Sequence, residues 1–376
     1  MHATHRAPPP RGLVVTHLRS STIPRDGHEA STQRETARRL AKIKGFLDGG
    51  EFDSLARYPA PKYFIPHETL TSAAASRLGI HGEDDLFGGV VPFSFAGTKT
   101  ITHPLVRTRS VAPRGWSIEF PRRVSKVVLN GFSAFDADDA FIGGRRLLEQ
   151  GAVRVKLATA NAGKGQFVVD TMAALATTLD RIDPSDMSEA GIVLEQNLAE
   201  VTTYSIGQFR VGDTVGTYYG LQQLTTNNHG ATVYGGSAIT VVRGDYDSLL
   251  SLHLSDDIRL AIVQARVYDD AADQCFPEFY ASRRNYDVAR GKDASGSPCC
   301  GVLEQSWRAG GASGAEIGAL EAFARYPSLH AVRAMTREVY GETPTLPANA
   351  TVYFSGTDPR VGRLTKYAWV EPYADA

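Results

Sequence analysis

Residues 153–170 read V-R-V-K-L-A-T-A-N-A-G-K-G-Q-F-V-V-D. Valines alternate with charged residues at the start of this stretch, and Phe167-Val168-Val169 resumes a strand pattern at its end. The residues between are small and polar and finish in Gly163-Lys164-Gly165. Glycine lets backbone N–H groups approach an anion, and Lys164 adds a positive charge. The stretch predicts a β-hairpin whose turn acts as a lid over a phosphate; an ordinary glycine-containing hairpin has the same pattern, so both interpretations stay open.

The P-loop, the best-known glycine-rich phosphate motif, does not fit this stretch. It requires Gly, four residues, Gly-Lys and then Ser or Thr, and a helix follows. Here Ala158 occupies the first glycine position, Gly165 occupies the hydroxyl position, and a strand pattern follows. A hairpin lid is therefore a better interpretation than a P-loop.

The composition is that of an ordinary globular protein. The chain has 376 residues, 42% of them hydrophobic and 22% charged, with a formal net charge of -1. This balance gives no reason to expect a nucleic acid or an acidic membrane as partner. No apolar run reaches the length of a membrane span, and we expect residues 1–12 to form a flexible tail without the apolar core of a signal peptide.

The cysteines indicate the compartment. Cys299 and Cys300 are adjacent and only one other cysteine occurs, so the chain cannot build a disulfide framework. We therefore expect a reducing environment, the cytoplasm.

The first half of the chain alternates strand and helix patterns, which is typical of a small parallel α/β unit. Up to residue 94 the expected strands are 13–15, 63–65 and 86–91, and the expected helices are 28–47 and 72–78. Up to residue 190 follow a short helix within 101–106, a strand at 127–129, the hairpin, and helices at 136–150 and 171–179.

The second half is rich in strand patterns and predicts a largely antiparallel sheet. The expected strands are 191–195, several within 202–242, a pair at 282–289 and 301–306, and closing strands at 350–354 and 366–370. The expected helices are 256–271, 316–324 and 328–340. Many polar side chains lie between residues 195 and 243; they either bind an acceptor or form the solvent face of the sheet.

Four features with charged side chains, each a candidate for a binding or catalytic site, follow one another along the chain. Lys99 precedes a short helix, Lys156 lies in the hairpin, Glu195 ends an apolar strand, and Asp287 and Glu304 lie in the expected strand pair. If those two strands are adjacent, the two carboxylates converge on one side of the sheet. Magnesium prefers such oxygen ligands, usually together with nucleotide phosphates. Two solvated carboxylates and a strand lysine that reaches water are the alternatives.

The order of these features resembles the ATP-grasp superfamily over residues 95–313. Most specific is V-L-E-Q-S-W-R at 302–308, which is similar to the family pattern of an apolar pair, Glu, any residue, Asn, any residue, Arg. The whole chain also resembles a bacterial family of unknown function, domain of unknown function 3182, in the blocks at 86–92 and 282–288.

The resemblance implies a mixed α+β and α/β architecture, the ATP-grasp fold, in which two α+β subdomains clasp ATP. Residues 13–94 would form an N-terminal pre-grasp α/β domain. Residues 95–190 would form the small subdomain with the glycine-rich lid, and residues 191–376 the large subdomain with the metal site.

The resemblance also implies roles for single residues. Lys99 and Lys156 would contact ATP phosphates beneath the lid of Gly163, Lys164 and Gly165. Glu195 and the backbone from Gln196 to Leu198 would line the adenine pocket, and Asp287, Glu304 and Ser306 would bind Mg²⁺, or Mn²⁺ in its place. Ser306 stands where the family commonly has Asn, and because a hydroxyl is a shorter and weaker oxygen ligand, the number of metal ions stays open.

Arginines would supply the remaining positive charge. Arg308, together with Arg284 or Arg283, can neutralise a transferring phosphoryl group or bind a substrate carboxylate, because guanidinium presents a bidentate fork. The residues do not choose between these roles. With Lys156, Arg308 and Arg284 are the catalytic residues that we expect, whereas His103 and His229 are expected to be structural.

These features predict an ATP- and Mg²⁺-dependent ligase that activates a small-molecule carboxylate as an acyl phosphate for attack by an amine or similar nucleophile; a homodimer is compatible with this. Carboxylase-like or kinase-like phosphoryl transfer on the same fold is an alternative. Another is an ATP-binding sensor with weakened chemistry, favoured by Ser306 and by Thr98, which replaces the usual acid before Lys99. The motifs of serine hydrolases and zinc proteases are absent from the sequence.

Overall fold

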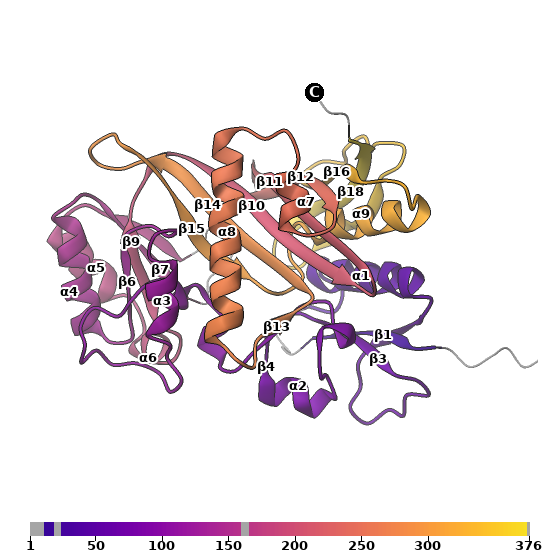
Figure 1. Ribbon diagram of the computed structural model, residues 1–376, viewed down its shortest axis with the longest axis horizontal. Helices are drawn as coiled ribbons and strands as arrows, with labels where there is room; N and C mark the ends of the chain where they lie inside the picture. The colour runs from indigo at the N-terminus through magenta and orange to yellow at the C-terminus, as the bar shows by residue number, and fades with distance from the viewer. Residues whose placement is uncertain (1–10, 19–23, 159–164, 374–376) are drawn as a thin grey trace, which may run out of the picture.

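The structure is a computed structural model that describes residues 11–18, 24–158 and 165–373. Its largest sheet is antiparallel and has eight strands (Figure 1). Their order is β15 (Pro298–Ser306), β14 (Arg283–Lys292), β10 (Ala199–Val211), β11 (Thr214–Thr226), β12 (Thr232–Arg243), β16 (Ala331–Tyr340), β18 (Gly362–Pro372) and β17 (Thr351–Asp358). The predicted antiparallel character of the second half of the chain is confirmed.

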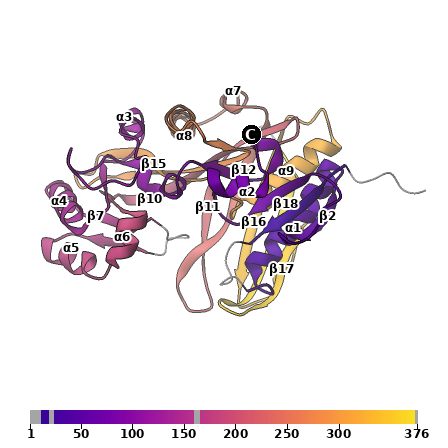
Figure 2. The same cartoon turned by 90° about the horizontal axis from the view of Figure 1, so that it is seen from below.

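Helices cover both faces of this sheet. The long helix α8 (Asp256–Cys275) packs on β10, β14 and β15, and the short helix α7 (Tyr246–Leu250) lies beside it (Figure 2). Helix α9 (Ser313–Arg325) packs on β11, β12, β16 and β18. Neighbouring residues of β14 point to opposite faces, because Arg283 contacts α9 and Arg284 contacts α8.

A second antiparallel sheet contains both strands of the hairpin predicted at residues 153–170. Its order is β6 (Gly131–Ala134), β9 (Ile192–Gln196), β7 (Val153–Leu157) and β8 (Gln166–Val169), and α4 (Ala137–Leu148) and α5 (Met172–Leu179) pack against it. The hairpin is confirmed, since Leu157 N–H donates to the Gly165 carbonyl at 2.9 Å. Helix α6 (Pro184–Ala190) leads into β9. Gly163 and Lys164 lie outside the described residues.

The N-terminal part is a parallel α/β unit, as predicted. Its sheet has the order β2 (Leu47–Glu51), β1 (Leu13–His17) and β3 (Lys62–Pro66), covered by α1 (His28–Lys44). The expected helix 28–47 ends early because Gly45 adopts a left-handed conformation, with φ of 64°, and caps the helix with its N–H group. The chain then forms β2.

Three short strands join this unit to the large sheet. Their order is β13 (Tyr280–Ala281), β5 (Gly89–Val91) and β4 (Leu70–Thr71), with α2 (Ser72–Leu78) directly after β4. Strand β13 comes just before β14, and Ser282 between them donates to the Leu86 carbonyl at 2.5 Å. Segments nearly 200 residues apart in the sequence are therefore paired side by side.

Two predicted elements are wrong. In place of the helix expected at 328–340, residues 331–340 form β16. Apolar residues at 332, 335 and 339 fit helical spacing, yet burial alternates from Val332 through Arg333 to Ala334, as in a strand. Residues 127–129 make only one bridge, Val128 to Val302, and the strand of that region is β6. The short helix expected within 101–106 is a 3-10 helix at Lys99–Thr102, capped by the Thr98 hydroxyl.

Two further observations concern the whole described chain. Cys275, Cys299 and Cys300 are free, in agreement with the expected lack of a disulfide framework. Among the described residues, no helix is long and apolar enough to cross a membrane.

Candidate active site

An acidic pair lies on the α9 side of the large sheet. Asp287 on β14 and Glu304 on β15 are directly opposite in register, so both side chains leave the same face. Lys99 Nζ lies 2.6 Å from Glu304 Oε2, and Gln222 donates to Asp287 Oδ1 at 2.8 Å. The expected convergence of the two carboxylates is therefore confirmed, whereas their role with a metal stays a proposal.

The electrostatics of this pair favour a cation. Burial, and then the negative charge of Glu304, raise the pKa of Asp287 to about 7. Lys99, only 5% exposed, is a cation that the protein itself places there. A second positive charge between the carboxylates would relieve the remaining repulsion.

The donor set fits a divalent cation such as Mg²⁺ that also binds a nucleotide. Carboxylate oxygens of Asp287 and Glu304 are its preferred ligands, and phosphate oxygens usually complete its coordination. No group of three or more His, Cys, Asp or Glu side chains within the described ranges could hold a metal ion. Ser306 lies opposite Asn285, one residue pair further along the same face. A metal would thus take only two carboxylates from this part of the protein.

A second charged cluster lies in the four-stranded sheet. Lys156 on β7 forms an ion pair with Glu195 on β9, and the side chains are only 2% and 1% exposed. His103 Nε2 lies 3.2 Å from Glu195 Oε2. Burial acts to raise the pKa of Glu195, but the Lys156 charge and the His103 contact outweigh it and lower the value to about 2. Glu195 is therefore held as a carboxylate, and Lys156 does not reach into water.

The sequence predicts a structural role for His103 but not its contact with Glu195. It is fully buried and contacts Glu195 through Nε2, whereas its Nδ1 has no hydrogen-bond partner in the part of the chain that is described. A buried polar atom without a partner is costly to the fold. No local motif marks this histidine.

One short segment connects the two clusters. We call residues 98–103 the bridge segment; Lys99 reaches Glu304 from it and His103 reaches Glu195. The Ser133 hydroxyl donates to the Thr100 carbonyl at 2.5 Å, and the Thr102 hydroxyl lies 2.9 Å from the Tyr268 hydroxyl on α8. The bridge segment therefore fixes the two lysine–glutamate pairs relative to both sheets.

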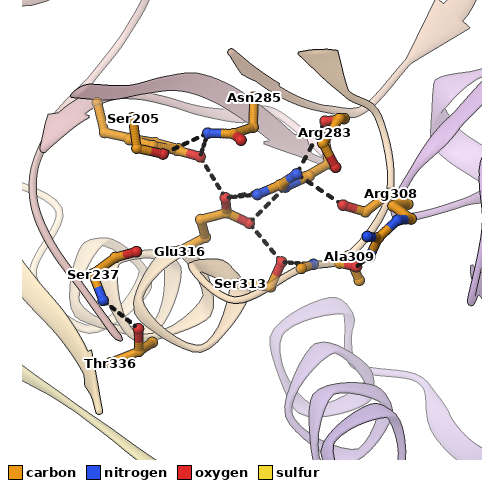
Figure 3. A network of polar contacts seen from close by, with 12 residues as sticks. Ser205, Ser237, Arg283, Asn285, Arg308, Ala309, Ser313, Glu316 and Thr336 are labelled. Atoms are coloured by element: carbon orange, nitrogen blue, oxygen red, sulfur yellow. Dashed lines mark hydrogen bonds and ion pairs between the residues drawn. The ribbon is translucent and has the colours of Figure 1, made fainter. Parts of the chain in front are cut away.

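The three arginines occupy different positions. Arg284 does not join the acidic pair: it lies on the other face of β14 and contacts Asp269 at 2.7 Å and Asp273 at 2.9 Å, both on α8. The prediction that Arg284 lies beside the phosphoryl group is wrong, because its side chain points to the face of β14 opposite to that of Asp287. Arg283, on the face of Asp287, pairs with Glu316 at 2.8 Å (Figure 3).

Arg308 is half-buried and free to receive an anion. Its Nη1 donates to the Ala309 carbonyl at 3.1 Å, and no carboxylate in the described part of the chain lies within ion-pairing distance. Burial, and then the charge of Arg283, lower its pKa, while Glu304 acts in the opposite direction. Burial and the nearby Arg283 charge both disfavour the charged guanidinium, so an anion that binds to it would stabilise it.

The polar side chains of the large sheet are engaged rather than simply solvated. Tyr218 is fully buried and donates to Glu316 at 2.7 Å, and Gln222 bonds Asp287. The Tyr234 hydroxyl lies 2.7 Å from Ser237 Oγ and 3.1 Å from Thr336 Oγ1. The solvent-face interpretation is wrong for the buried Tyr218; binding of an acceptor stays a proposal.

Residues 14–368 match a family described as "Protein of unknown function (DUF3182)". The chain belongs to this family. A search of curated proteins found no match for the DUF3182 chain.

Solved structures with ATP-grasp folds resemble this DUF3182 protein. A carboxyaminoimidazole ribonucleotide synthase from Aspergillus clavatus, complexed with ATP, is 12% identical, with a TM-score of 0.52 over 96% of this chain and 94% of that one. A phosphoribosylamine–glycine ligase from Thermotoga maritima is 12% identical, with a TM-score of 0.50 over 96% and 92%. The biotin carboxylase domain of a Hydrogenobacter thermophilus 2-oxoglutarate carboxylase, with MgADP, ADP and bicarbonate, is 11% identical, with a TM-score of 0.50 over 96% and 86%. The DUF3182 chain has the ATP-grasp fold.

We expect Lys156→Met to lower the free energy of unfolding by roughly 3–5 kcal/mol, because Glu195 is left as a buried charge without its counter-ion. Replacing both residues, by Lys156→Met with Glu195→Gln, should recover a large part of this loss. Urea unfolding at pH 7 measures the difference. Lys292→Met, which breaks an exposed lysine–glutamate pair with Glu200, should cost less than about 1 kcal/mol. Equal losses in the single and double variants would contradict this account of the pair.

The raised pKa of Asp287 predicts a pH-dependent stability. Its carboxyl group binds a proton in the folded state up to a pH of about 7, whereas the unfolded state releases it near the ordinary value of 3.8. The contribution of this group to stability therefore falls as pH rises between these values. Asp287→Asn should remove that fall, so the variant gains at least about 1 kcal/mol on the wild type between pH 5 and pH 8. Urea unfolding with a chelator present measures this; a difference that is the same at both pH values would refute it.

Proposed function

We propose that this protein is an ATP- and Mg²⁺-dependent ligase that activates a carboxylate for attack by an amine or a similar nucleophile. The observation that carries the proposal is the cluster of Asp287, Glu304 and Lys99 on one face of the large sheet. It combines two cation ligands with a lysine that can move from a carboxylate to a phosphate. Arg308 lies four residues after Glu304, and its guanidinium has no carboxylate partner among the described residues.

The proposed reaction has two steps. An oxygen of the substrate carboxylate attacks the γ-phosphorus of ATP, the bond to the β,γ-bridging oxygen breaks, and ADP leaves. The nucleophile then attacks the acyl phosphate at carbon and expels inorganic phosphate, while its proton goes to solvent. Such chemistry depends on positioning and charge neutralisation more than on a general base. A divalent cation, when bound, would offset phosphate charge beside Asp287 and Glu304.

Each cluster receives a part of the nucleotide in this proposal. Lys156 and Lys99 bind phosphates, and Glu195 with the backbone of Gln196 and Leu198 lines the adenine pocket. Arg284 is left out, because its partners on α8 hold it on the opposite face of the sheet.

Ser306 favours a second candidate, an ATP-binding sensor without turnover. A hydroxyl in the position where the superfamily commonly has Asn weakens the third oxygen ligand, and the described residues offer a metal only two carboxylates. Binding of ATP would then be retained while phosphoryl transfer is slow. The two candidates differ in turnover and agree on binding.

The metal and nucleotide parts of the proposal are tested by calorimetry on Lys99→Met. Its affinity for Mn²⁺ alone should rise, because Glu304 loses the ammonium that neutralises it, whereas its affinity for Mg-ATP should fall roughly tenfold or more through the lost phosphate contact. Glu304→Gln should weaken the binding of both. The control Lys366→Met breaks a similar lysine–glutamate pair, with Glu338 at 2.8 Å, and should leave both affinities unchanged. Wild-type protein that binds no Mg-ATP would refute the proposed function.

Turnover separates the ligase from the sensor. Release of ADP and phosphate should appear only when a pool of small carboxylates and a pool of small amines are supplied together, and Arg308→Ala should reduce its rate roughly a hundredfold. Tight Mg-ATP binding with no ADP release across broad pools would favour the sensor.

A further inference from the structure

The chain leaves the large sheet through a short loop that carries Arg308. We call residues 306–313 the arginine loop; it begins with the last residue of β15 and ends at the first residue of α9. The last register pair between β14 and β15 is Asn285 with Ser306. Beyond it, the backbone groups of the loop have no neighbouring strand to bond and need other partners.

The Arg283 guanidinium provides these partners from within the sheet. Its Nη1 donates to the Ser306 carbonyl at 3.0 Å and to the Arg308 carbonyl at 2.8 Å. Arg283 is only 2% exposed. A lysine could not make the same contacts, because the planar guanidinium holds several donors in a fixed geometry.

Glu316 on α9 completes the set of contacts that attaches the arginine loop to the sheet. It accepts from Arg283 Nη2 at 2.8 Å, from Tyr218 at 2.7 Å and from Ser313 Oγ at 3.0 Å (Figure 3). Ser313 Oγ in turn accepts from the Gly310 N–H at 3.0 Å. The arginine loop is thus held at both ends and near its middle by one buried network.

Stability alone does not explain this network. Burying two charges costs about as much as their attraction returns, and apolar side chains of similar size would stabilise such a site equally well. The network instead fixes the path of the backbone on both sides of the Arg308 side chain. Glu304, on the strand that leads into the loop, is one of the acids whose charge acts on that guanidinium.

We propose that Arg283 and Glu316 are positioning residues that hold the arginine loop so that Arg308 faces the Asp287–Glu304 pair. They touch no substrate in this proposal and act through Arg308. The role of Arg308 at the transferring phosphoryl group rests on the proposed function, whereas the attachment of the loop does not. The two parts are therefore tested separately.

The attachment is tested by amide hydrogen exchange on the full-length chain without ligands. Arg283→Lys and Glu316→Gln, which keep charge or shape, should speed exchange in residues 307–312 roughly tenfold or more, since each loses hydrogen bonds to a charged group. Exchange in β7 and β9, which the network does not touch, should stay as in the wild type. Melting temperatures identify any variant that is unfolded. Unchanged exchange of the loop in both folded variants would overturn the proposal.

The chain offers a matched control on the same helix. Arg243 also holds two backbone carbonyls, with Nη2 2.8 Å from the Phe323 carbonyl and Nε 3.3 Å from the Leu329 carbonyl, at the far end of α9. Arg243→Lys should loosen that end and leave the arginine loop unchanged. If it speeds exchange of the arginine loop as strongly as Arg283→Lys does, the effect is a general loosening of α9 and the proposal is wrong.

The action through Arg308 is tested by a double-mutant cycle on the ratio of Mg-ATP to Mg-ADP affinity. Arg308→Ala should lower this ratio by losing a γ-phosphate contact, Arg283→Lys should lower it similarly, and the double variant should fall no further than Arg308→Ala. Effects that add in the double variant would show that Arg283 acts elsewhere. Wild-type protein without Mg-ATP binding, or Arg308→Ala with an unchanged ratio, would refute the proposed role of Arg308, and hydrogen exchange would then decide on the attachment alone.

Discussion

The site depends on the buried bridge segment between the two sheets. Its first charged residue, Lys99, neutralises a carboxylate of the large sheet, and its last residue, His103, contacts a carboxylate of the small one. A buried charge requires a partner at a defined place, so these contacts constrain the two sheets far more narrowly than apolar packing would. The two halves of the proposed nucleotide site are thus held at opposite ends of six residues. A change in the angle between the sheets would strain or break the contacts of Lys99 and His103.

Several parts of the fold and site could be predicted from the sequence because they are local. The hairpin follows from alternation on both sides of a glycine-rich turn, and Asp287 and Glu304 are the only acids in β14 and β15. Their pairing required only that two strands joined by a short loop be adjacent. The resemblance to the ATP-grasp superfamily supplied the order of the elements, which no single motif could have provided.

The features that could not be predicted from the sequence depend on which face of a strand a side chain occupies, or on partners that are distant in the sequence. Arg283 and Arg284 look equivalent in the sequence, and only the parity of β14 sends one to Glu316 and the other to Asp269. Glu316 looks like an ordinary acid of a helix, although it lies at the centre of a buried network. Residues 328–340 carry apolar spacings that suit a helix as well as a strand, and the place of β16 inside a large sheet decides between them.

The pairing of β13 with β5 has a consequence for the order in which the protein can fold during synthesis. Gly88 N–H donates to the Ser282 side chain across a separation of 194 residues. One edge of β5 therefore stays open until the ribosome has made most of the chain, even though the strands around β1 are complete early. An exposed strand edge is a site for wrong pairing, and contacts this distant form slowly. The first 94 residues expressed alone would carry this open edge permanently, so the N-terminal unit is completed by the same stretch of chain that carries Arg283 into the site.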